Sequence, residues 1–183
     1  RIQGTLLVRG ASASLRATEA RGDIDIEADH LELEAVRLDT SGLTRFAGVT
    51  VAVRGVGTVG AVQGDLVFAG GEITASDLRW IGPVTIAATR VVVRDLDVQG
   101  SGTTALSVTA PDIDLAGVRV RGGWATGCVL EGRDVALADT EVAGAGVVVA
   151  ATGGVALAGV RVSDTLAGGA ANGVVAGKRV HAA

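Results

Sequence analysis

Apolar and polar positions follow one pattern that recurs seven times along this chain. Each copy is ten residues long, and its first, third, sixth and eighth positions are mostly apolar. The copies are residues 31–40, 51–60, 73–82, 91–100, 113–122, 135–144 and 155–164, and their starts are 20, 22, 18, 22, 22 and 20 residues apart. A repeat of this length predicts stacked supersecondary units.

The first half of each copy alternates as a β-strand does. Leu31 and Leu33 flank the polar Glu32, as in a strand with one buried face. The sixth and eighth positions, such as Leu96 and Val98, repeat the alternation after a step of three residues. A two-residue corner at this step lets both strands point inward. The corner holds residue types that tolerate left-handed or turn conformations, namely Gly55, Asp77, Asp95, Gly117, Asp139 and Gly159.

A third apolar segment precedes most copies. Its inward pairs are predicted to be Val84/Ile86, Leu106/Val108, Val129/Leu130, Val147/Val149 and Val174/Val175. Each repeat therefore contains three short strands and three bends, and stacking the repeats about 4.8 Å apart buries their apolar faces. The predicted fold is all-β, a parallel β-helix of about eight or nine coils of 18–25 residues.

One solenoid is expected over residues 1–183. Residues 1–21 match the pattern poorly and are predicted to form a degenerate first coil. Residues 177–183 match 132–138, which places Val180 in the first column and ends the chain partway through a coil. This favours a segment of a longer protein, with other protein segments or subunits bound at the open solenoid ends.

The coil lengths also bear on handedness. Left-handed β-helices usually keep near-strict coils of 18 residues, whereas these coils vary between 18 and 22. On this repeat pattern, residues 22–183 resemble the right-handed parallel β-helix repeat superfamily, whose best-known members are similar to pectate lyases. The resemblance implies a right-handed coil and an extracellular or cell-surface location.

The seventh position of the copies carries alternating charge. We call its residues the charge column: Arg37, Gly57, Arg79, Asp97, Arg119, Glu141 and Arg161. In a parallel stack these side chains point outward one strand spacing apart, so opposite charges in successive coils attract and favour one register.

Composition narrows the partners and the compartment. The net charge is −4, with 16 basic and 20 acidic residues interspersed, which argues against a nucleic-acid partner. Residues 142–160 are uncharged, as in a membrane-spanning helix, but they fit the repeat and are bounded by Glu141 and Arg161, so no membrane span is predicted. Cys128 falls at an apolar position and is expected to be a buried thiol.

Three carboxylates are the candidate catalytic residues, Asp77, Asp95 and Asp97. Carboxylates stacked along a β-helix face can bind Ca²⁺ or act as an acid/base pair on a glycan. The alternative interpretation is structural, with aspartates at corners and in the charge column, and no cofactor. Trp124, in a glycine-rich bend, is expected to be the one exposed aromatic and a candidate ligand contact.

The pattern favours a structural or interaction element without catalytic activity: a stalk, fibre or cell-surface segment of a larger protein. Abundant alanine, valine and glycine, with arginine preferred over lysine, are typical of GC-rich bacterial genomes. Two alternatives remain open. One is a polysaccharide-binding or polysaccharide-cleaving module that uses the acidic face around Asp77, Asp95 and Asp97. The other is a scaffold subunit that associates with copies of itself.

Overall fold

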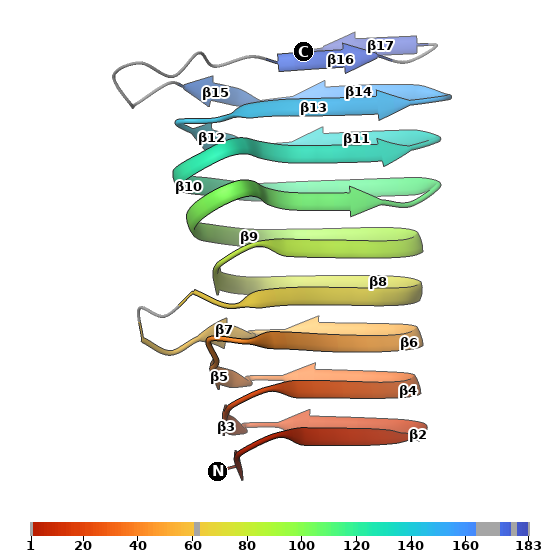
Figure 1. Cartoon of the computed structure of the whole chain (residues 1–183). Helices are drawn as coiled ribbons and strands as arrows, with labels where there is room; N and C mark the ends of the chain where they lie inside the picture. Colours follow the sequence, from red (N-terminus) through yellow and green to blue (C-terminus); the bar gives the residue numbers. More distant parts are fainter. Residues whose placement is uncertain (1, 61–62, 164–172, 177–178, 183) are drawn as a thin grey trace.

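The chain forms a parallel β-solenoid of about eight turns (Figure 1). The computed structural model describes residues 2–60, 63–163, 173–176 and 179–182. The strands of the first half are β1 (Ile2–Gln3), β2 (Leu6–Arg16), β3 (Glu19–Arg21), β4 (Ile24–Glu34), β5 (Arg37–Asp39), β6 (Leu43–Arg54), β7 (Gly57–Thr58) and β8 (Asp65–Ile81). Those of the second half are β9 (Val84–Thr109), β10 (Asp112–Gly132), β11 (Asp134–Ala138), β12 (Glu141–Ala143), β13 (Gly146–Ala151), β14 (Gly154–Ala158), β15 (Arg161–Ser163), β16 (Gly173–Ala176) and β17 (Arg179–Ala182).

The aligned copies stack in the predicted register. First-column residues pair in parallel from coil to coil, in the order Leu31, Val51, Ile73, Val91, Ile113, Val135, Val155 and Val180. The poorly matching first residues also join the stack, because Leu6 pairs with Ile24 and Ala13 with Leu31. In Figure 1 the chain rises from its N-terminus, running rightwards along the near wall and leftwards along the far wall, which is a right-handed path.

Each turn has the three predicted walls, which in chain order we call the first, second and third; in one turn they contain residues 84–86, 91–93 and 96–98. The strands are not all short. In the middle of the solenoid β8, β9 and β10 continue around the bends, and β9 alone is 26 residues long. Corner residues can still donate their backbone N–H groups to carbonyls of the next coil, even where a strand ends, as from Gly55 to Ser76 (3.0 Å) between β6 and β7. The hydrogen-bonded ladder therefore passes through the corner.

The corner between the second and third walls is left-handed in every copy. The φ angles are +57° at Asp95, +71° at Gly117 and +46° at Asp139. Ala17 (+46°) and Ala35 (+53°) take the same conformation in the first coils, although alanine gains nothing from it. The predicted corner is confirmed, and its position is set by backbone geometry that recurs from coil to coil.

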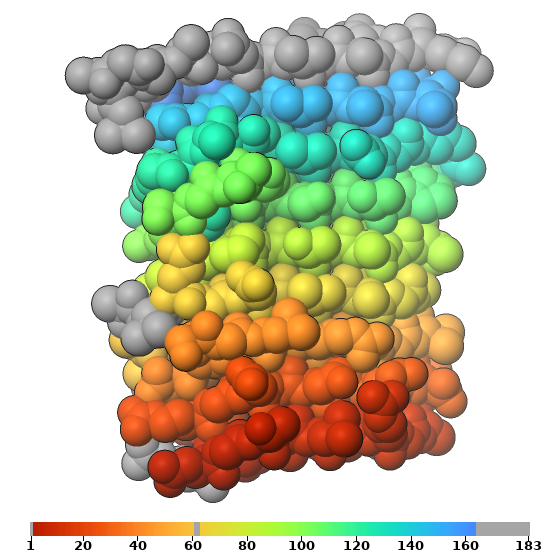
Figure 2. Space-filling model, viewed as in Figure 1, coloured from red at the N-terminus to blue at the C-terminus, as the bar shows by residue number. Residues whose placement is uncertain are grey.

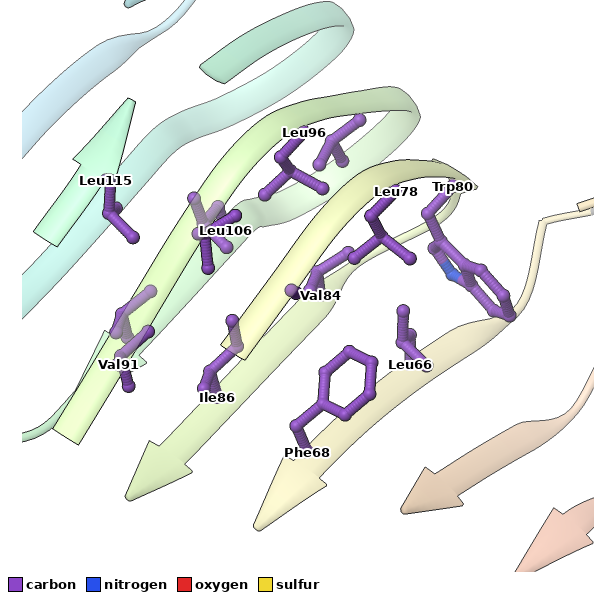
Figure 3. Close-up of a cluster of buried hydrophobic side chains, with 14 of the residues drawn as sticks. Leu66, Phe68, Leu78, Trp80, Val84, Ile86, Val91, Leu96, Leu106 and Leu115 are labelled. Atoms are coloured by element: carbon purple, nitrogen blue, oxygen red, sulfur yellow. The ribbon is translucent and has the colours of Figure 1, made fainter. Parts of the chain in front are cut away.

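The core is a stack of small aliphatic side chains (Figure 3). Phe46 and Phe68 stack in adjacent coils with ring centroids 5.6 Å apart. Trp80 is buried and donates its indole N–H to the Gly64 carbonyl at 2.7 Å. Cys128 is buried as expected and is in register with Leu106.

Among the predicted inward pairs whose side chains the structure describes, which leaves out Val174/Val175, one is wrong by one position. Cys128 and Leu130 point into the core, and Val129 is half-buried. An irregularity of register between Thr126 and Cys128 shifts the alternation at this point. Among the described residues, no helix is long and apolar enough to cross a membrane, and the uncharged stretch 142–160 lies in β12, β13 and β14.

Candidate functional site

Two of the three candidate carboxylates are corner residues. Asp77 and Asp95 occupy the left-handed corner in adjacent coils, and both are exposed. The Asp95 Oδ1 atom lies over Gly117 of the next coil, 2.7 Å from where a β-carbon at that glycine would be. Asp139 covers Gly159 in the same way, at 2.8 Å. These aspartates therefore fill the space that a glycine leaves open in the following coil.

Asp97 is positioned differently, on the third wall. It is in register with Arg79 on one side and Arg119 on the other, as the charge column predicts. Its Oδ2 accepts a long hydrogen bond (3.5 Å) from the Gln99 amide, and its Oδ1 is buried without a hydrogen-bond partner. The candidate carboxylates thus lie at a corner and on a wall.

A metal site at these residues has no further support from the geometry. In the parts of the chain that the structure describes, no three His, Cys, Asp or Glu residues are grouped closely enough to hold a metal ion. The predicted Ca²⁺ site stays a prediction.

Trp124 corrects an expectation from the sequence, because it is only 4% exposed. Its ring lies over two glycines of the preceding coil, 3.0 Å from the β-carbon position of Gly100 and 3.2 Å from that of Gly102. The indole N–H donates to the Arg121 carbonyl at 3.1 Å. Trp124 is in register with Gly102 of the preceding coil. A large residue aligned with a glycine one coil earlier was therefore the sequence signal that could have predicted its burial.

Outward charges instead pair between neighbouring coils, in places that the charge column did not indicate. The largest group lies on the first wall, where Arg9 and Arg45 flank Asp25 and Glu27. Arg45 approaches Asp25 at 2.9 Å and Arg9 approaches Glu27 at 2.5 Å. The hydrogen bond with Asp25 is the main cause that raises the pKa of the Arg45 guanidinium above its usual value.

The second wall carries similar pairs. Arg94 contacts Asp114 at 2.5 Å, and Arg90 contacts Glu72 at 3.3 Å. Arg133 bridges Asp112 and Asp134. The bond from Arg133, followed by the Gly154 N–H, lowers the pKa of the Asp134 carboxyl.

In Figure 2 successive coils appear as stacked bands. An open hollow on the second wall is lined by Asp112, Asp114 and Asp134 beside the small Ala136 and Ala156. All three carboxylates there already bind arginines. The ion pairs of Asp112 and Asp114 join neighbouring coils. Asp134 pairs with its sequence neighbour Arg133 and joins the next coil by accepting a hydrogen bond from the Gly154 N–H.

The buried thiol offers no nucleophile near neutral pH. Burial raises the pKa of Cys128 to about 12, because the thiolate would lose its hydration. Comparison with protein-family models, with curated proteins and with solved structures found no match for this chain.

Proposed function

We propose that this chain is a structural or interaction segment, a stalk, fibre or cell-surface element of a larger bacterial protein, with no catalytic activity of its own. The observation that carries the proposal is the use of outward charge. On the first two walls, arginines and carboxylates of neighbouring coils are bound to one another across the stack. Side chains held in this way stabilise a rod. The candidate carboxylates lie outside these pairs, with Asp77 and Asp95 at the left-handed corner and Asp97 in the charge column.

The finer assignment, to the right-handed parallel β-helix repeat superfamily, belongs to the same proposal. It is supported by coils of unequal length, three walls per turn and a left-handed two-residue corner. The extracellular or cell-surface location is taken from that resemblance alone.

The test is an assay for polysaccharide cleavage. The 183-residue chain is incubated with neutral and acidic polysaccharides, with and without Ca²⁺, and new reducing ends and unsaturated products are measured. A matched variant carries Asp77→Asn, Asp95→Asn and Asp97→Asn together. The proposal expects no product from either protein. Product from the wild type that the triple variant fails to form would establish the glycan-cleaving alternative.

Sedimentation velocity distinguishes the self-associating scaffold from the proposed function. A rod that acts as a segment of a larger protein stays monomeric as its concentration rises. Filaments that grow with concentration would favour self-association.

A further inference from the structure

The charge column has one missing charge. Glu19 is in register with Arg37 and extends the column downward. The complete order is Glu19, Arg37, Gly57, Arg79, Asp97, Arg119, Glu141 and Arg161, with every step in register. Acidic and basic residues alternate throughout, except that a glycine stands where an acid is due. At Gly57 two arginines therefore flank an empty position.

This position is an open hollow of about 640 Å³. It is lined by Arg37 and Arg79, by the backbone of Gly55, Gly57 and Gly60, and by Asp77 at the corner. Among the described residues, neither Arg37 nor Arg79 forms an ion pair within 4 Å; the arginines that do are Arg9, Arg16, Arg21, Arg45, Arg90, Arg94 and Arg133. The two arginine Cα atoms are separated by two strand spacings, roughly 9.6 Å.

The donors in this hollow are the two guanidinium groups. The backbone N–H groups of Gly57 and Val59 are already used, since they donate to Val36 (3.0 Å) and Leu38 (2.8 Å) of the coil below. A guanidinium binds a carboxylate through two parallel N–H···O bonds of roughly 2.8 Å. Two arginines two strands apart leave room for one carboxylate between them.

We propose that this hollow, the Gly57 gap, binds the side-chain carboxylate of an aspartate or glutamate from an acidic protein segment. Twice in the same column the chain places an acidic residue in register between two arginines, at Asp97 and at Glu141, although these side chains form no ion pair within 4 Å with the flanking arginines. A partner's carboxylate at Gly57 completes the alternation of charge along the column. The inference rests on the proposed function, because it gives an interaction element its contact.

Other ligand classes fit the gap less well. The paired positive charges disfavour a cation. The net charge of −4, with basic and acidic residues interspersed along the chain, provides no basic stripe for a nucleic-acid backbone. Both tryptophans are buried, so they offer a sugar ring no exposed platform for stacking.

Asp77 opposes the ligand from the rim of the gap. Its exposed carboxylate lies on the wall of the hollow and makes no ion pair with Arg79 within 4 Å. Neutralising it by Asp77→Asn keeps a residue type that tolerates the left-handed corner. The Gly57 gap then binds a carboxylate more tightly, whereas a cation site would bind more weakly.

The experiment titrates the full 183-residue chain with an extended glutamate-rich peptide at low salt and measures the dissociation constant. Arg37→Gln and Arg79→Gln are each expected to weaken binding about threefold or more, and Asp77→Asn to strengthen it. Gly57→Glu fills the gap and abolishes binding, while Gly57→Ala shows the effect of the β-carbon alone. Arg121→Gln, an exposed arginine outside the gap, is the matched control and binds like the wild type.

Three further ligands are titrated for comparison: a peptide with glutamine in place of glutamate, an oligouronate and free sulfate. The proposal is overturned by no binding of the acidic peptide, by equal losses in Arg121→Gln, or by undiminished binding in Gly57→Glu. Tighter binding of the oligouronate would assign the gap to a glycan instead. None of these outcomes produces polysaccharide cleavage, so failure here is distinguishable from failure of the proposed function.

Discussion

At the left-handed corner, replacing glycine by alanine should destabilise the fold in one coil, and replacing alanine by glycine should stabilise it in another. Gly117 has φ +71°, and a β-carbon there would lie 3.2 Å from the Asp95 backbone nitrogen and 2.7 Å from its Oδ1. A left-handed alanine costs about 1–2 kcal/mol, and reduced entropy of the unfolded chain returns about 0.4–1 kcal/mol. With the crowding from Asp95, Gly117→Ala should lower the free energy of unfolding by at least about 1 kcal/mol.

Ala35→Gly should do the reverse, because Ala35 already bears this conformation at φ +53°. Relief of strain exceeds the entropy cost by about 0.5–1 kcal/mol. For a chain of this size each kcal/mol moves the melting temperature by about 2–4 °C.

Thermal and urea unfolding followed by circular dichroism measure both changes. Gly123→Ala is the control, since a β-carbon at Gly123 makes an ordinary contact of 3.5 Å with Ser101 and its φ is not left-handed. The reasoning is refuted if Gly117→Ala is as stable as Gly123→Ala, or if Ala35→Gly is less stable than the wild type.

Three further predictions follow from burial and charge. Trp124→Ala should lower the free energy of unfolding by about 3–5 kcal/mol, because the ring is buried. In Trp80→Phe, where Trp124 is the remaining tryptophan, its fluorescence should resist quenching by acrylamide. Efficient quenching would contradict its burial. Burial raises the pKa of Cys128 to about 12 in the folded chain, so the unfolded chain loses this proton at a lower pH. The free energy of unfolding should therefore fall between about pH 9 and 12 more steeply in the wild type than in Cys128→Ala. Parallel pH profiles of the two proteins would contradict this. At low salt, Gly57→Glu should be more stable than Gly57→Ala by about 0.2–1 kcal/mol, because the new carboxylate lies between two arginines. High salt should remove this difference. Equal melting temperatures at low salt would contradict the attraction expected in the charge column.

Periodicity was enough to predict the walls and the corner of this fold. A strand that buries one face repeats every two residues, and the three-residue step between Val93 and Leu96 can be met only by a bend. Both features are local in sequence, and both recur with the coil. The register of the charge column follows from the same alignment.

Side-chain contacts between coils were harder to predict. The burial of Trp124 depends on Gly100 and Gly102, which lie a whole coil earlier and leave the space that its ring fills. The ion pairs on the first two walls depend on how long arginine side chains lean across the stack, and Arg133 reaches Asp112 from an adjacent bend. Column spacing fixes the positions of such residues and leaves their rotamers undetermined.

We infer that ion pairs between neighbouring coils stabilise the stack. A double-mutant cycle on the first wall is the most direct test. Arg45→Gln, Asp25→Asn and the double variant are unfolded in urea at low salt, and the coupling energy is taken from the three changes in stability. The 2.9 Å contact predicts a favourable coupling of about 0.5–1 kcal/mol. The distant pair Arg121→Gln and Asp25→Asn should be additive. A coupling of zero between Arg45 and Asp25 would contradict the claim that these charges stabilise the stack.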